Sequence, residues 1–181
     1  MLFKLNIHLT ENDYKAFNHF HSLESAQGKK AIRNGRIFFS VIMACLALLV
    51  FLPEGVTAFS LTYATLLLLG TIIYVAVFKK MVIRNLNSQI KKLKKTGKLP
   101  YDPVSNFEFH QDHMVEIAES SRTEQGYSCI ERVCVLHDRY LLLYKNSVGA
   151  YILPMEQVKA QVDPDAFLAF LAQKCTNIQH Y

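Results

Sequence analysis

The sequence predicts an α+β membrane protein in which a two-helix transmembrane hairpin is joined to a cytoplasmic, curled antiparallel β-sheet capped by a C-terminal helix. Apolar residues make up 51% of the 181 residues, and they concentrate at positions 37–78. Positive charges lie on both flanks of this region, and Glu54 is its only charge. The flanks alternate apolar and polar residues as soluble domains do. We therefore expect four segments: an N-terminal strand and amphipathic helix (1–36, cytoplasmic), the hairpin (37–78), a basic juxtamembrane helix (79–99) and a β-rich domain (100–181).

The N-terminal segment predicts a strand followed by a helix. Four apolar residues alternate with polar ones, the signature of a half-buried strand: Phe3, Leu5, Ile7 and Leu9. Thr10 is suited to cap a helix whose first turn is acidic, and this helix is expected to end before Gly28. Because no partner strand follows nearby, the N-terminal strand is expected to dock onto the C-terminal sheet.

Two uncharged runs predict the membrane spans. The run at 37–52 is slightly shorter than the ~20 residues that cross a hydrocarbon core, whereas the run at 59–78 is long enough. A turn at Pro53-Glu54-Gly55 separates them. A signal peptide is disfavoured because a patterned segment of 36 residues precedes the first run. A soluble hairpin would have to be buried on all sides. Gly70 and nearby small residues are compatible with a homo-oligomer.

The charges around the spans predict the orientation. Lys and Arg near membrane ends stay on the cytoplasmic side. Such residues precede the first run (Lys29, Lys30, Arg33 and Arg36) and follow the second. The expected localisation is therefore the cell membrane, with two spans and both termini cytoplasmic.

The segment 79–98 has no acidic residue, and its apolar residues recur at helical spacing. It could continue the second helix along the anionic inner leaflet, where each basic residue adds about 1 kcal/mol. The residues expected to contact the membrane surface are Lys79, Lys80, Arg84, Lys91, Lys92, Lys94 and Lys95. The alternative is that these basic residues serve only as a topological anchor, which fixes the orientation of the spans. No nucleic acid is expected as a partner, since no reading motif accompanies the charges.

After a break at Leu99-Pro100 the pattern is one of short strands. Strands are expected around 107–110, 114–118, 127–136, 140–144 and 150–153, with a turn at 111–113 and a loop at 120–126. Two tight turns are expected, at His137-Asp138-Arg139 and at Asn146-Ser147. Pro164, with Asp163 as its N-cap, opens a final helix with an apolar stripe.

Several segments carry a resemblance to a known family: "LTENDYKAFNHFHS", the basic stretch, the two spans, "FEFHQDHMVEIAES", "YSCIERV" and "YLLLYKNSVGAYILP". Their order resembles the YcxB-like family of bacterial membrane proteins. The resemblance implies a pleckstrin-homology-like (PH-like) soluble domain, a scaffold or binding role, and no catalytic activity. Tyr127 stands near the place where the family commonly has Trp, and the resemblance carries over no functional residue.

The sequence predicts neither a catalytic site nor a metal or cofactor. His110 and His113, with Asp112 between them, form the best local cluster, but no third ligand can be assigned. The four cysteines show no ligand spacing. Carboxylates on the expected strands and loops are assigned to the solvated outer face of the sheet: Glu108, Glu116, Glu119 and Glu131. No phosphate-binding loop or nucleophile elbow is present, so an enzyme is not expected.

Two functions fit these features. The first is a membrane-anchored, non-enzymatic binding or scaffold module of a bacterial inner membrane, whose partners are membrane lipids and a protein held at the inner leaflet. It predicts a groove or an exposed strand edge in the sheet domain. The second is an immunity or stress-protection protein against a membrane-active peptide, in which the hairpin itself acts. An enzyme or transporter subunit would need an ionisable pair in the spans or a convergent polar pocket, and the sequence predicts neither.

Overall fold

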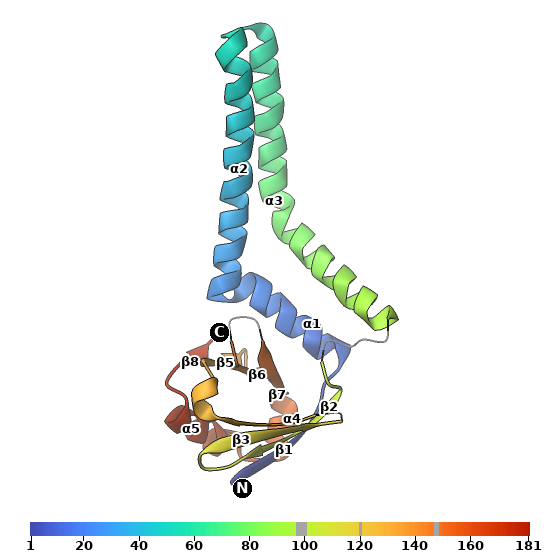
Figure 1. The fold of residues 1–181 in the computed structure, drawn as a ribbon, viewed down its shortest axis with the longest axis vertical. Helices are drawn as coiled ribbons and strands as arrows, with labels where there is room; N and C mark the ends of the chain where they lie inside the picture. Colours follow the sequence, from blue (N-terminus) through green and yellow to red (C-terminus); the bar gives the residue numbers. More distant parts are fainter. Residues whose placement is uncertain (97–100, 120, 147–148) are drawn as a thin grey trace. The chain divides into compact units, whose positions relative to one another are not determined.

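The computed structural model describes residues 1–96, 101–119, 121–146 and 149–181, apart from the side chain of Glu54. Lys98, the break at Leu99-Pro100, Ser120 of the expected loop and Ser147 of the expected turn lie outside the described residues. The chain is α+β and forms two compact units, one of Met1–Phe17 with Gly97–Tyr181 and one of Asn18–Thr96 (Figure 1). We call them the β domain and the helical unit.

The first sheet of the β domain unites the two ends of the chain. Its strands, in spatial order, are β1 (Phe3–His8), β2 (Val104–Phe109), β3 (His113–Ala118) and β4 (Arg122–Gly126). The pairing of β1 with β2 is antiparallel and sets Leu5 opposite Phe107. Both side chains are buried, so apolar alternation on each strand fixes the register. The expected docking of the N-terminal strand onto the C-terminal sheet is confirmed.

A second sheet corrects the expectation of one curled sheet. Its strands, in spatial order, are β7 (Ala150–Pro154), β6 (Tyr140–Tyr144), β5 (Arg132–Leu136) and β8 (Ile178–His180). β8, which the sequence analysis missed, is parallel to β5, whereas the other pairs are antiparallel. The expected turn between 136 and 140 is confirmed: Arg139 N–H bonds Leu136 C=O at 2.8 Å, and His137 and Asp138 have φ of 44° and 53°.

The chain crosses between the sheets at the segment expected to be one long strand. Residues 127–129 form a 3₁₀ turn (Tyr127–Cys129) instead, and β5 begins at Arg132. Tyr127 fixes this turn, because its hydroxyl donates to the His110 carbonyl at 2.8 Å and its ring packs edge-on against Phe170 at 5.6 Å. β4, expected to be a loop, was missed because its five residues carry no apolar side chain that alternation could reveal.

The core lies between the two sheets and is closed at one end by α5 (Pro164–Lys174). This helix begins as expected, with Pro164 at its start and Asp163 as its cap. Phe167 is fully buried and meets Phe109 and Phe3 at ring distances of 4.9 and 5.3 Å. A short helix that the sequence did not predict, α4 (Met155–Lys159), adds Met155 and Val158 to the core. Because α5 closes only one end of the core, it does not cover the inward-facing side chains at the other end of the two sheets.

The helical unit begins within α1 (Glu11–His19) and continues through a π-helical turn (Phe20–Glu24) into α2 (Ala26–Glu54) and α3 (Ala58–Lys95). The expected end of the N-terminal helix before Gly28 is confirmed, since the helical residues stop at Glu24 and Ser25 is extended. Ser25 caps α2 by accepting a bond from Gly28 N–H at 3.0 Å. Gly28 lies inside the first turn of α2, where a Cβ would overlap the backbone of His21 and Ser22. A glycine is therefore required at position 28, where the chain bends from the π-helical turn into α2.

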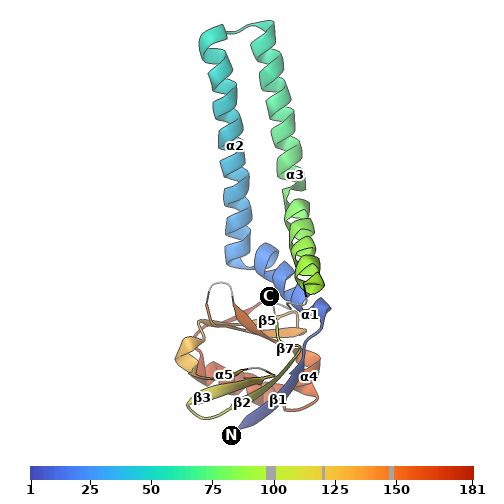
Figure 2. The ribbon, with the colours of Figure 1, turned by 45° about the vertical axis from the view of Figure 1, so that its right-hand side comes forward.

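α2 and α3 lie side by side along their apolar length, and α3 turns away from α2 over its C-terminal part (Figure 1; Figure 2). Their contact includes Phe39 stacked on Tyr74, with ring centroids 3.7 Å apart. A Cβ on Gly35 would approach the Phe78 ring to 2.8 Å. Gly70 meets nothing within 4 Å in this chain, whereas Gly35 lies where α2 and α3 pack closely. Both helices are long and apolar enough to cross a membrane, and no residue of their apolar windows is buried.

Candidate functional site

Strand alternation directs one carboxylate of the first sheet inward. Met114 on β3 belongs to the core, and Glu116, two residues further along, shares its face because strand side chains alternate. Phe107 is the cross-strand partner of Glu116 and is itself a core residue. Glu116 therefore points between the sheets, at the end that α5 does not cover. The expectation of a solvated outer face for Glu116 is wrong.

The second sheet directs a cation and a phenol to the same place. Lys145 follows β6 on the face of the core residues Leu141 and Leu143. Tyr151 of β7 pairs across the sheet with Leu143 and is also a core residue. The Lys145 Nζ atom lies 4.0 Å from the centroid of the Tyr151 ring, which is cation–π geometry. The two sheets thus bring an acid, a base and a phenol together.

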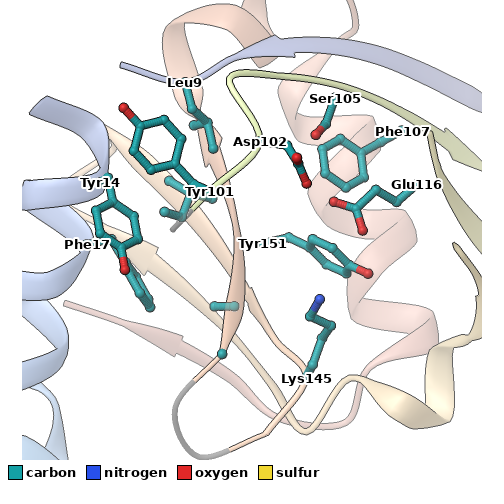
Figure 3. Close-up of a pocket in the computed structure, with 13 residues that line it drawn as sticks. Leu9, Tyr14, Phe17, Tyr101, Asp102, Ser105, Phe107, Glu116, Lys145 and Tyr151 are labelled. Atoms are coloured by element: carbon teal, nitrogen blue, oxygen red, sulfur yellow. The ribbon is translucent and has the colours of Figure 1, made fainter. Parts of the chain in front are cut away.

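These side chains line a cavity of about 250 Å³, which we call the mouth pocket (Figure 3). Its polar lining comes from Asp102, Ser105, Glu116, Lys145 and Tyr151. Its aromatic lining comes from Tyr14, Phe17, Tyr101 and Phe107. Tyr14 and Tyr101 stack with centroids 5.0 Å apart, which joins α1 to the segment that leads into β2. A second contact holds α1 in the β domain, since the Tyr140 hydroxyl donates to Asp13 Oδ1 at 2.9 Å.

The mouth pocket perturbs its titratable groups. Burial raises the pKa of Glu116 above its usual 4.5, and the nearby charge of Lys145 acts in the opposite direction. Burial also raises the pKa of Tyr151, helped by the neighbouring Glu116. Tyr151 is only 5% exposed, and its Oη atom lies beside the Glu116 and Gln125 side chains without forming a hydrogen bond of good geometry to the described residues. Because buried hydroxyls are nearly always bonded, this group is suited to a ligand or a water molecule.

The other three carboxylates that were expected on the outer face of the sheet, Glu108, Glu119 and Glu131, do not line the mouth pocket. Glu108 lies 3.4 Å from the Lys4 ammonium. Glu119 and Glu131 are exposed. The spacing of Glu116 from Met114 was the sequence signal that could have placed Glu116 on the inner face. The two residues are two positions apart on one strand, so their side chains lie on the same face.

The histidine cluster forms a pair, with the rings of His110 and His113 stacked at 4.5 Å. Each lies near a carboxylate: His110 is 3.9 Å from Glu108 and His113 is 3.5 Å from Glu124. Within the part of the chain that the structure describes, no three His, Cys, Asp or Glu residues gather as metal ligands.

The expected membrane-surface residues all lie on α3 and are exposed: Lys79, Lys80, Arg84, Lys91, Lys92, Lys94 and Lys95. α3 is one continuous helix to Lys95, as the spacing predicted. At about 100° per residue, all but Lys79 and Lys92 fall within about 100° of the helix circumference. The apolar residues occupy an adjacent arc: Ile83, Leu86, Ile90 and Leu93. Three of the cations share one shallow groove of about 480 Å³ with Asn87 and Ser88, namely Lys80, Arg84 and Lys91.

Comparisons with protein-family models, with curated proteins and with solved structures found no match to this chain. The geometry of the mouth pocket and of α3 is therefore the basis for the proposals that follow.

Proposed function

We propose that the chain is a membrane-anchored, non-enzymatic binding module of a bacterial inner membrane, with both termini in the cytoplasm. The observation that carries this proposal is the exposure of the apolar windows of α2 and α3, in which no residue is buried. Large side chains there are open, such as Phe38 at 69%, Leu52 at 80% and Leu66 at 63%. Since burial of one such side chain is worth about 1.5–3 kcal/mol, a bilayer is the solvent that suits this surface.

The charges support the orientation. The connection between α2 and α3, residues 55–57, is uncharged, and cationic side chains lie on the segments at the opposite ends of the apolar windows. Under the positive-inside rule those ends are cytoplasmic. Both ends of the chain, and the β domain that they form together, would then lie on the cytoplasmic side.

The length of α3 supports contact with the membrane surface. Its 38 residues span about 57 Å, whereas the hydrocarbon core is about 30 Å thick. The basic part from Lys79 onward must therefore lie outside the core. An arc of apolar residues beside an arc of cations fits a helix lying on anionic lipid, with the cations at the headgroups.

The β domain supports the binding role. Two sheets enclosing a core, with a helix closing one end, fit the proposed PH-like architecture, and β8 is an addition to it. We further propose that the chain belongs to the YcxB-like family, on its order of segments. Edge pairing is not available at β1, because the Gln161 side chain bonds both the N–H and the C=O of Asn6 at 2.7 and 2.9 Å. The mouth pocket, which gathers charged and aromatic side chains, is the binding feature that we favour.

Alkaline extraction of membranes from cells that express the full chain tests the anchoring. We expect the chain to stay in the membrane pellet at high pH, as integral proteins do. A control with Leu66→Arg and Leu69→Arg places two charges in the second span and should reduce the pelleted fraction. Release of the unaltered chain into the supernatant would contradict integral anchoring.

A further inference from the structure

We propose that the mouth pocket binds a primary alkylammonium group. This inference rests on the proposed function, because it names the chemical class of ligand that the binding module takes. The group belongs to small organic amines, and it also occurs at the end of an ethanolamine headgroup. Both sources share the same chemistry: a tetrahedral cation that carries three N–H donors and an aliphatic stem.

The charge of the lining favours a cation. Asp102 and Glu116 contribute two negative charges when ionised, and Lys145 contributes one positive charge. Asp102 is close enough to Glu116 for their charges to interact. With both carboxylates ionised the lining carries one net negative charge, and an anion would have to approach two carboxylates.

The aromatic lining favours an ammonium over other cations. The faces of Tyr and Phe rings attract organic cations. The pocket already displays this contact in its own structure, since the Lys145 ammonium lies over the Tyr151 ring at 4.0 Å. Figure 3 shows the Tyr151 ring between the Glu116 carboxylate and the Lys145 side chain.

The hydrogen-bonding groups favour a primary amine over a quaternary one. An ammonium has three donors and no acceptor, and ionised carboxylates are acceptors only. The Tyr151 hydroxyl lies beside Glu116, and its oxygen can accept a bond, which makes it a third acceptor with Glu116 and Asp102. A tetramethylammonium ion would leave all three acceptors without a donor.

The size of the pocket favours a short stem. Sites for drug-sized ligands occupy about 300–1,000 Å³. At about 250 Å³ the mouth pocket is below this range, which suits an amine with a few carbon atoms.

The Lys145 ammonium then competes with the ammonium of a ligand for the same place in the mouth pocket. Its Nζ atom occupies the face of Tyr151, but it forms no ion pair within 4.0 Å of Glu116 in the described structure. Lys145 is exposed. A ligand can therefore displace it into water. Removing Lys145 should strengthen binding of an ammonium and weaken binding of an anion, so the two ligand classes give opposite signs.

Saturation-transfer NMR on the full chain in a nonionic detergent tests this proposal. The probes are n-butylammonium, phosphoethanolamine and tetramethylammonium at neutral pH. We expect n-butylammonium to bind at least tenfold more tightly than tetramethylammonium. Glu116→Gln should weaken binding of n-butylammonium at least tenfold, and Lys145→Gln should strengthen it several-fold. Glu131→Gln, the same change at an exposed site, should leave it unchanged.

The outcomes separate the alternatives. Binding of both amines supports a lipid headgroup as the source, and binding of n-butylammonium without phosphoethanolamine supports a free amine. Loss of binding in the Lys145 variant, equal effects of the Glu116 and Glu131 variants, or no binding of n-butylammonium would each overturn the proposal. Those failures would leave the membrane anchoring intact, because alkaline extraction tests it independently.

Discussion

The side-chain amide of Gln157 pairs with the backbone of His8 as a neighbouring strand would. Its Oε1 atom accepts from the His8 N–H at 2.8 Å, and its Nε2 atom donates to the His8 carbonyl at 2.8 Å. Gln161, four residues later, forms the same pair with Asn6. Because Asn6 and His8 are two residues apart on one strand, both present their backbone groups on the same edge. Two glutamines thus close the outer edge of β1.

Replacing both glutamines tests this closure. We expect Gln157→Ala with Gln161→Ala to lower the free energy of unfolding by about 1–3 kcal/mol, because four hydrogen bonds to the β1 backbone are lost to water. The freed edge should also promote self-association. Denaturant unfolding and size-exclusion chromatography measure the two effects. Gln173→Ala on α5 is the control, and an equal effect there would show that the edge contacts contribute nothing specific.

The stability of the β domain should depend on pH through Glu116, and the raised pKa of Glu116 sets the direction of this dependence. The pKa of Glu116 in the folded chain is raised above its usual 4.5, so ionisation is more costly in the folded state than in the unfolded state. The contribution of Glu116 to the free energy of unfolding is therefore fully present below pH 4.5, and it is lost as the pH rises through the pKa of Glu116 in the folded chain.

Glu116→Gln removes this dependence. The variant should therefore be more stable than the unaltered chain at pH 7, and the difference should shrink towards pH 4. The groups that set the pKa of Glu116 are Lys145, Tyr151 and Asp102, and the substitution leaves them in place. Denaturant unfolding at several pH values measures the difference. A variant that is less stable at pH 7 would contradict the burial of this carboxylate.

Two glycines of the hairpin should respond differently to the same substitution. Gly35→Leu places a side chain where even a Cβ would lie 2.8 Å from the Phe78 ring, so we expect the helix pair to be destabilised by about 1–3 kcal/mol. Gly70→Leu meets open space and should be neutral or slightly stabilising, since Leu favours helices over Gly. Unfolding in mixed micelles compares them. Equal effects would mean that Gly35 does not face Phe78.

The basic part of α3 should present two distinct faces to a membrane. Spin labels at Leu93→Cys and Lys91→Cys lie on opposite sides of the helix, because two residues advance it by about 200°. In bilayers with anionic lipid we expect the label at 93 to be accessible to oxygen and the label at 91 to a water-soluble nickel reagent. Removing the anionic lipid should weaken this contrast. Equal accessibility in both bilayers would contradict surface contact.

The sequence was most informative where one periodicity extended without interruption. Alternation revealed β1 and its docking, and the length of the apolar run revealed α3. Sequence patterns failed where the structure depends on contacts between distant residues. β4 has no apolar face, and the start of β5 depends on the turn that Tyr127 fixes by its bond to His110. Glu116 was misjudged because a carboxylate on a strand usually faces water, although it shares the face of Met114 two residues earlier.

The most direct test of the membrane hairpin is labelling of single cysteines with a membrane-impermeant maleimide, before and after cells are opened. Cys129 is exposed on the β domain, and Val56→Cys lies in the connection between α2 and α3. Each variant keeps one of these two positions, with the other cysteines replaced by alanine. The account predicts labelling at position 56 in intact cells and labelling at Cys129 only after opening. Labelling of Cys129 in intact cells would contradict a cytoplasmic β domain.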